Sequence, residues 1–466
     1  MTLLSESAGQ ARKLHERYVN PVFSNVLEMI GFAHEYTQGK GCYVTTQDGR
    51  EFLDALSGYG VFGMGRNHPV VCRAIAQAME MNLANLVQMD CFLLSGLLAE
   101  KLISLAPGKL QHVFFTNSGT EAVEGAIKFA RAATHRPRIL FNKGAFHGLS
   151  TGSLALNGDE SFREGFGDLL PGCRKVDWED LTAVEDELKS DQVAAVVLEP
   201  VRGKGVFYPK NDEVYPTIQR LCREHGTLLV ADEIQCGLGR TGRWWACGHW
   251  GLEPDILVTA KALSGGLIPV GAILYTDEVY RKVFSRLDRC VVHSSTFGQN
   301  ALAMVAGLAA LQVLEEEKLV ERSARQGERL LAGLRELVPK HEFLLEVRGK
   351  GLMVGIEFGP PRSLLLKPAW SVLHTAQAGL FAQAVVMQLY GRHQILTQVA
   401  GHHQEVVKLL PPFIITDEET DRLIAAVDEV LTQCRRFPGP IWTVGKQLAG
   451  AAAKQRFFSR EEAVTR

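Results

Sequence analysis

The chain has 466 residues, of which 46% are hydrophobic and 22% charged, and its formal net charge is −2. This composition indicates an ordinary globular protein with room for more than one core, and the near-neutral charge excludes strong electrostatic binding to nucleic acid or an anionic membrane. No apolar run is long enough to span a membrane, and the N-terminus lacks the hydrophobic stretch of a signal peptide. The nine cysteines are scattered without a C-x-x-C pair, so we expect a reducing compartment and place the chain in the cytoplasm.

The pattern of apolar residues predicts an α/β fold. A helix is expected over 67–80, where Pro69 stands at a favoured first-turn position. Short continuous apolar runs then alternate with amphipathic stretches. Such runs suit strands buried on both faces, and they predict a mostly parallel central sheet flanked by helices. The expected strands occupy 112–116, 193–198, 227–231, 256–260 and 270–275.

The C-terminal part of the chain predicts a second, smaller domain. A long helical pattern runs from Asn300 to about residue 337, and an α+β region follows, with a strand over 352–358 and a last helix over 419–432. The expected division is a large domain over 83–325, a small α+β domain over 326–438 to which the N-terminal segment 1–82 contributes, and a tail over 439–466.

Two polar residues stand at the ends of separate buried strands. Asp232 closes one apolar run, and Lys261 follows another and precedes the turn at Gly265-Gly266. A pyridoxal-phosphate (PLP) enzyme needs this pair: a carboxylate for the pyridinium nitrogen and an amine for the Schiff base. Taken alone, each has a simpler explanation, because most lysines are solvated and a buried acid can cap the next element.

A phosphate seat is the second predicted feature. Ser118, Gly119 and Thr120 follow the strand at 112–116 and start a helix, where free amide groups, a glycine and two hydroxyls can hold an anion. Taken alone, these residues are more simply explained as an ordinary N-cap, and it is the surrounding pattern that favours the phosphate seat.

An aromatic residue at a glycine-rich turn is the third feature. Phe146 precedes His147 and Gly148, and its ring can lie flat on a cofactor ring, although each residue alone is more often structural. Gln235, three residues after Asp232, can reach the phenolic oxygen of that ring.

Six ordered segments together give the chain a family resemblance. They are FFTNSGTEAVEGAIKFAR, GAFHG, AAVVLEPVRG, LLVADEIQCGLGRTG, PDILVTAKALSGG and SSTFGQN. The chain resembles the class III aminotransferases, PLP enzymes of fold type I, over about residues 25–435, and it looks nearest to their putrescine and ornithine branch.

The resemblance implies a role for each cofactor residue. Lys261 would form the Schiff base and move the substrate proton, and Asp232 would pair with the pyridinium. Gln235 would contact the phenolic oxygen, and Phe146, beside His147, would stack on the ring. The phosphate would be held by Ser118, Gly119 and Thr120.

The resemblance also implies a second subunit and a substrate contact. Thr296 would reach the phosphate of the neighbouring subunit, so we expect a homodimer with its active site at the interface. Glu199 corresponds to a gating or substrate-recognition glutamate.

The chain departs from the family pattern in its C-terminal half and beside Thr296. Gln299 stands where the family commonly has glycine, and Lys408 where ornithine-type relatives commonly have arginine for the α-carboxylate of the substrate. Lysine keeps the charge but loses the planar two-point fork. The apolar segment 364–370 shapes the substrate entrance or simply packs, and His402-His403 has no partners at metal spacing, so no metal is expected.

The segment Gly58–Gly63 matches the G-x-G-x-x-G pattern of dinucleotide-binding folds. A true fingerprint starts a helix directly, whereas loop-type residues follow here, so we reject this interpretation. In the resembling family this region lies near the substrate mouth, which makes Tyr59 and Phe62 candidate walls of the substrate pocket.

The sequence therefore predicts a PLP-dependent ω-aminotransferase. It would move a primary amino group from a diamine, ω-amino acid or aliphatic amine to a 2-oxo acid, either 2-oxoglutarate or pyruvate. The alternatives are an ornithine or acetylornithine aminotransferase, and an aminomutase or a decarboxylating dialkylglycine-type enzyme on the same scaffold. A nicotinamide dehydrogenase and a non-catalytic binding protein are the rivals from other classes.

Overall fold

The computed structural model describes residues 3, 6–401, 404–436, 438, 439, 442, 443, 445, 446, 448 and 450. The chain divides into two compact units. The large unit is Gly58–Arg325, and the small unit combines Met1–Ser57 with Gln326–Arg466. Residues 58–82, which we expected in the N-terminal segment, belong to the large unit, because helix α5 (Pro69–Glu80) packs there against α12 (Ala301–Glu316).

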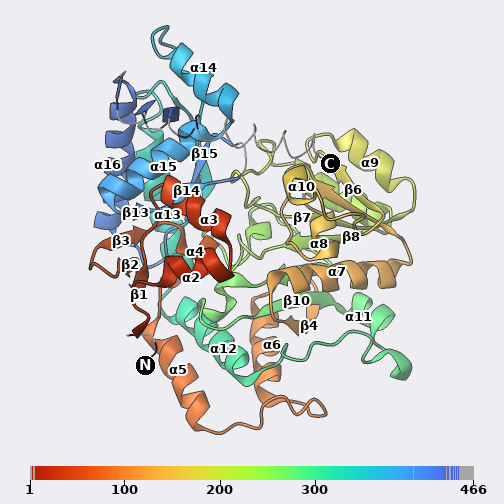
Figure 1. Ribbon diagram of the computed structural model, residues 1–466. Helices are drawn as coiled ribbons and strands as arrows, with labels where there is room; N and C mark the ends of the chain where they lie inside the picture. Colours follow the sequence, from red (N-terminus) through yellow and green to blue (C-terminus); the bar gives the residue numbers. More distant parts are fainter. Residues whose placement is uncertain are drawn as a thin grey trace. The chain divides into compact units, whose positions relative to one another are not determined.

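A seven-stranded sheet forms the centre of the large unit (Figure 1). Its order is β4-β10-β9-β8-β7-β5-β6, and within this sheet β10 alone runs antiparallel to its neighbours, which confirms the predicted mostly parallel arrangement. Every residue of β7 is buried, as a strand covered on both faces requires. The strands are β4 (Leu110–Thr116), β5 (Arg138–Asn142), β6 (Cys173–Val176), β7 (Val193–Leu198), β8 (Leu228–Asp232), β9 (Ile256–Thr259) and β10 (Gly271–Thr276).

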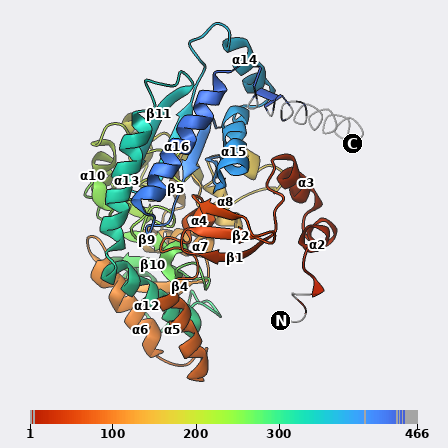
Figure 2. The same ribbon diagram turned by 90° about the vertical axis from the view of Figure 1, so that its left-hand side faces the viewer.

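The helices of the large unit pack on this sheet and on one another. Helix α7 (Gly119–Thr134) lies against the sheet and buries Ala122, Val123 and Ala126 in its core. Helix α12 lies beside α5 and α6 (Leu93–Leu105), as Figures 1 and 2 both show. The other α-helices are α8 (Thr151–Ala155), α9 (Leu181–Leu188), α10 (Val214–Glu224) and α11 (Asp277–Val283), and the 3-10 helices are η1 (Glu160–Phe162), η2 (Ala246–His249), η3 (Lys261–Ser264) and η4 (Leu287–Arg289).

The small unit contains two four-stranded sheets and several helices, so it is of the predicted α+β type. One sheet has the order β1-β2-β3-β13 and the other β11-β12-β15-β14. The strands are β1 (Tyr36–Lys40), β2 (Tyr43–Thr46), β3 (Glu51–Asp54), β11 (Leu344–Lys350), β12 (Met353–Phe358), β13 (Ile395–Leu396), β14 (Gln398–Val399) and β15 (Val406–Leu409). Its described helices include α2 (Ala11–Tyr18), α3 (Pro21–Met29), α14 (Lys367–Ala376), α15 (Leu380–His393) and α16 (Asp417–Cys434).

The helical pattern after Asn300 forms two helices rather than one. Helix α12 ends at Glu316, and α13 (Leu319–Arg335) begins after Lys318, whose φ of +50° is incompatible with a continuous helix. Among the described residues, no helix is both long and apolar enough to cross a membrane.

The apolar segment 364–370 divides into a buried and an exposed part. Trp370, on α14, is buried and lies near Phe343 and Phe381, with ring centroids 6.1 and 4.9 Å away. Leu364 and Leu365 are exposed. Packing therefore explains Trp370, whereas the position of the two leucines is not explained by contacts within the small unit.

Candidate active site

Asp232 and His147 form a buried pair at the carboxyl ends of two parallel strands. Asp232 ends β8, and His147 lies in the loop after β5. The His147 Nδ1 and Asp232 Oδ2 atoms are 2.7 Å apart, and the Ile234 amide donates to Asp232 Oδ1 at 3.1 Å. Burial alone would lower the pKa of His147, but the hydrogen bond and negative charge of Asp232 outweigh it and raise that pKa.

This pair makes stability depend on pH in a defined direction. Because the folded pKa of His147 is above its ordinary value of 6.5, the pair contributes stability that is complete below about pH 6.5 and is lost as the pH rises through the folded pKa. We expect the difference in unfolding free energy between the parent protein and His147→Gln to shrink over that range. Urea unfolding of the cofactor-free proteins at a series of pH values measures it, and a pH-independent difference would contradict the pairing.

Lys261 lies one strand away from Asp232. Strand β9 pairs in parallel with β8, Asp232 is opposite Val258, and Lys261 follows three residues later at the start of η3. Desolvation lowers the pKa of the Lys261 amine, although the charges of Asp232 and Glu199 oppose this shift. Its φ of +43° is unusual for a residue with a side chain and is typical of strain held at functional positions. No hydrogen bond or ion pair joins this amine to another described residue.

The predicted phosphate seat is an N-terminal turn of α7 held by neighbouring side chains. Ser118 is the N-cap and its Oγ accepts from the Glu121 amide at 3.3 Å, so the ordinary capping role exists in this structure. Thr120 Oγ1 lies 2.7 Å from Ser153 Oγ and accepts from the Ser150 amide. A Cβ atom at Gly119 would meet Ile234 Cδ1 at 2.9 Å, which explains glycine at this close approach.

Glu199 joins the loop that carries Phe146 to a second loop. Its Oε1 accepts from the Phe146 amide at 3.0 Å, and its Oε2 accepts from the Gly203 amide at 2.6 Å. Burial raises the pKa of the Glu199 carboxyl, and the nearby His147 opposes this shift. Both carboxylate oxygens thus have backbone partners, a positioning contact that the sequence did not reveal.

The predicted pocket walls lie beside Gln235 and the turn after Lys261. Gln235 Nε2 donates to the Tyr59 carbonyl at 2.9 Å, and a Cβ atom at Gly266 would meet Phe62 at 2.6 Å. Tyr59 is exposed. Gly58 and Tyr59 both have positive φ inside the short segment α4 (Ser57–Gly60), so no regular helix starts here as a dinucleotide fingerprint requires.

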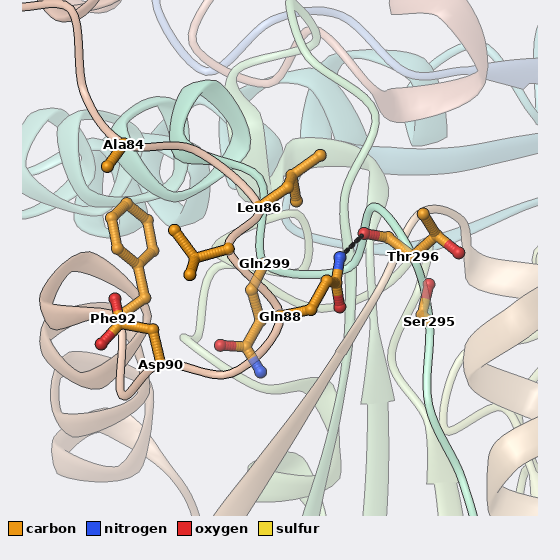
Figure 3. Close-up of a pocket in the computed structure, with 9 residues that line it drawn as sticks. Ala84, Leu86, Gln88, Asp90, Phe92, Ser295, Thr296 and Gln299 are labelled. Atoms are coloured by element: carbon orange, nitrogen blue, oxygen red, sulfur yellow. Dashed lines mark hydrogen bonds between the residues drawn. The ribbon is translucent and has the colours of Figure 1, made fainter.

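Thr296 lies in a pocket formed by the segment before α6 and the segment before α12 (Figure 3). Gln88 Nε2 donates to the Thr296 carbonyl at 2.9 Å, and Gln299 also lines the pocket. The neighbouring Ser295 Oγ accepts from Asn117 Nδ2 at 2.9 Å, which connects this segment to the residue before the Ser118 turn.

Lys408 belongs to the small unit. It lies on β15 opposite Gly355 and Gln398, is 4% exposed, and its carbonyl accepts from Thr397 Oγ1 at 2.6 Å. His402 and His403 lie outside the described residues. Elsewhere in the described part of the chain no cluster of three or more His, Cys, Asp or Glu side chains is arranged to hold a metal.

The residues of the large unit fit PLP. The buried Asp232 carboxylate suits a pyridinium nitrogen, and the desolvated Lys261 amine suits an imine. His147 Nε2 is buried without a partner among the described groups, which leaves a polar atom available to a bound molecule or water. A Cβ atom at Gly148 would meet Thr120 Oγ1 at 2.5 Å, so the loop can approach the Ser118 turn only as glycine.

Comparison with known proteins agrees with this chemistry. The sequence profile described as "Aminotransferase class-III" matches residues 28–431, and the chain belongs to that family. It is 36% identical over 430 residues to the putrescine aminotransferase of Pectobacterium atrosepticum, covering 89% of this chain and 86% of the relative. It is 32% identical over 454 residues to the aminotransferase PigE of a Serratia species, covering 91% of this chain but 53% of PigE, so the chain spans about half the length of that relative.

A solved structure gives the same result for the fold. The ornithine aminotransferase of Toxoplasma gondii superposes with a TM-score of 0.76 at 29% identity, covering 86% of this chain and 92% of that structure, which is described as having partial occupancy of PLP at its active site. The predicted family, fold type I, aminotransferase class and PLP as the cofactor of that class are thereby confirmed.

Proposed function

We propose that this protein transfers a primary amino group from a diamine, ω-amino acid or aliphatic amine to a 2-oxo acid. The observation that carries the proposal is the desolvated Lys261 amine, which follows β9 at the start of η3, one strand away from the buried Asp232–His147 pair. The similarity to a putrescine aminotransferase supports a donor with a terminal amine.

The side chains divide the work of proton transfer. PLP, when bound, supplies an electron sink for the carbon that loses its proton. Asp232 holds a proton on the ring nitrogen, and His147 orients the Asp232 carboxylate through the 2.7 Å contact. Desolvation favours the neutral form of the Lys261 Nζ atom. In this form Nζ can take the proton from the donor carbon and would then deliver it to the cofactor. Its partial burial limits the access of water to this step.

The remaining predicted residues bind and orient. We assign the phosphate to the amide groups and hydroxyls of Ser118, Gly119 and Thr120, and the face of the ring to Phe146. Gln235 contacts the phenolic oxygen in this proposal. Its hydrogen bond to the Tyr59 carbonyl supports a fixed orientation of its side-chain amide.

The working unit that we propose is a cytoplasmic homodimer. In this dimer Thr296 contacts the phosphate of the cofactor that is bound to the partner subunit. This assignment is supported by the exposure of Thr296 and by the polar pocket formed with Gln88 and Gln299. A dimer also supplies a cover for the exposed apolar residues near that pocket, among them Met89, Leu93 and Phe297.

Lys408 determines the breadth of the donor range in this proposal. An ammonium cannot bind an α-carboxylate with two parallel hydrogen bonds. Donors without that carboxylate therefore lose little binding free energy at this position compared with donors that have it. Glu199 remains our candidate for substrate recognition, but we assign it an indirect role. Its carboxylate holds the Phe146 and Gly203 loops in place and does not itself bind the substrate.

A donor panel tests both the reaction and this donor range. We expect putrescine and a long aliphatic amine to be used at least as well as ornithine, with 2-oxoglutarate or pyruvate as acceptor, giving glutamate or alanine plus a free carbonyl product. In Lys408→Arg we expect the preference for ornithine over putrescine to rise about tenfold, the value of one good charge-assisted hydrogen bond.

Product chromatography separates the alternatives. An aminomutase would isomerise its substrate without net consumption of the 2-oxo acid, and a decarboxylating enzyme would release carbon dioxide. Activity restricted to α-carboxylated donors would contradict the donor range and favour the ornithine or acetylornithine alternative.

A further inference from the structure

Lys204 lies close to Phe146 in the large unit and contacts two aromatic rings. Its Nζ atom is 4.0 Å from the centroid of the Phe162 ring and 5.3 Å from that of the Phe146 ring. The two rings meet edge to face, with centroids 5.8 Å apart and an interplanar angle of 73°. An ammonium at these distances is attracted to the faces of both rings, most strongly where little water reaches it. The Lys204 side chain is only 12% exposed.

The ammonium of Lys204 is itself held in place. It forms an ion pair with Asp159 Oδ2 at 3.0 Å, while Asp159 Oδ1 accepts from the Ser161 amide and hydroxyl at the start of η1. Both Asp159 oxygens are thereby engaged, so the carboxylate is a fixed anchor rather than a mobile surface group. The backbone beside it is also tied to the Phe146 loop, because the Gly158 amide donates to the Ala145 carbonyl at 2.9 Å.

Phe146 is consequently fixed from several directions. Its amide is held by Glu199 and its ring by Lys204 and Phe162. Glu199 reaches the Lys204 loop as well, since its other oxygen accepts from the Gly203 amide. An ion pair with a purely structural role would require neither the contact of Lys204 with both rings nor the link through Glu199 between the Phe146 and Lys204 loops.

We infer that Lys204 is a positioning residue that fixes the ring of Phe146 for stacking on the cofactor, with Asp159 as its anchor and Phe162 as its second contact. The inference rests on the proposed function in that it gives the Phe146 ring its place on PLP. Lys204 touches neither substrate nor cofactor in this assignment; it acts through Phe146.

The test measures cofactor binding rather than turnover. PLP is titrated into the cofactor-free full-length protein, followed by visible absorbance and by the circular dichroism of the bound cofactor. We expect Lys204→Met to raise the dissociation constant of PLP roughly 2- to 30-fold, the range of a partly desolvated cation–π contact, and to weaken the dichroism. Lys204→Arg should restore most of both, because a guanidinium also binds ring faces.

Two controls separate this role from general stabilisation. Lys175→Met removes a 2.9 Å ion pair with Glu160, the residue after Asp159, and should leave PLP binding unchanged. In a Phe146→Leu background, Lys204→Met should add no further loss of affinity. If Lys204→Met fails to fold, Asp159→Asn gives the same test by releasing the ammonium from its anchor.

Three results would overturn the inference. The first is an unchanged PLP affinity of Lys204→Met; a higher KM for the 2-oxo acid in the same variant would place Lys204 on the substrate. The second is an equal loss of affinity with and without Phe146, and the third is an equal loss in Lys175→Met. Failure of the proposed function looks different: the parent protein would bind PLP but transfer no amino group from any donor, and the effect of Lys204→Met on PLP affinity could still be read.

Discussion

Lys261→Ala is expected to lower amino transfer from putrescine to 2-oxoglutarate by about 10³-fold or more, because it removes the amine that we propose as both the covalent attachment and the proton carrier. The substitution deletes an amine that is costly to desolvate and that has no hydrogen-bond partner among the described residues, so the folded state should survive. Turnover and the visible absorbance of the reconstituted protein measure the effect, and thermal unfolding checks the fold.

A charge-retaining variant and a remote lysine complete this experiment. Lys261→Arg keeps a cation at the site but cannot form an imine, and it should be as inactive as the alanine variant. Lys101→Ala removes a surface ion pair with Glu315 and should retain activity. Turnover by Lys261→Ala at the parent rate would show that our assignment of the amine is wrong.

Asp232→Asn is expected to lower kcat/KM by about 10²- to 10³-fold, the usual cost of losing one preorganised electrostatic partner. An amide can still accept from the Ile234 backbone but carries no charge to keep a ring nitrogen protonated. The loss of that charge also removes the cause of the raised His147 pKa. We therefore expect altered cofactor absorbance as well as slower turnover.

Asp255→Asn is the matched control for Asp232→Asn. Asp255 is another largely buried carboxylate of the large unit, and it accepts from the Leu229 amide at 2.8 Å. It stands before β9, at the opposite end of this strand pair from Lys261. A loss of turnover of the same size in both variants would mean that any buried carboxylate of this sheet matters equally, which would refute a special role for Asp232.

Much of the large unit could be predicted because its strands are unusually apolar. Continuous apolar runs identified β4, β7, β8, β9 and β10, and the residues that follow or end β8 and β9, Asp232 and Lys261, were therefore predicted to act as a pair. Strands β5 and β6 were not predicted, because β5 has only three consecutive apolar residues, 139–141, and Arg174 and Lys175 interrupt the apolar pattern of β6.

Contacts between distant parts of the chain could not be predicted from residue patterns. The pairing of His147 with Asp232 spans 85 positions, and Glu199 reaches Phe146 across 53. Each contact depends on which strands are neighbours in the sheet, and a single sequence carries no signal for that order. The break at Lys318 was missed for a similar reason, since the residue type does not reveal its positive φ.

The pairing of β8 with β9 has a consequence for how the reactive groups tolerate change. The separation between the acid and the amine is set by backbone hydrogen bonds in register, Asp232 opposite Val258, and not by the long connection between the two strands. Ile234 and Gln235 at the start of that connection belong to the proposed site, but we expect that residues farther along it can be gained or lost, and that surrounding loops can diversify toward new amines, without a change in the separation of Asp232 and Lys261. The residues proposed for the chemistry and those proposed for substrate choice thus lie in separate parts of the polypeptide. Substrate choice can therefore evolve while the chemistry stays constant.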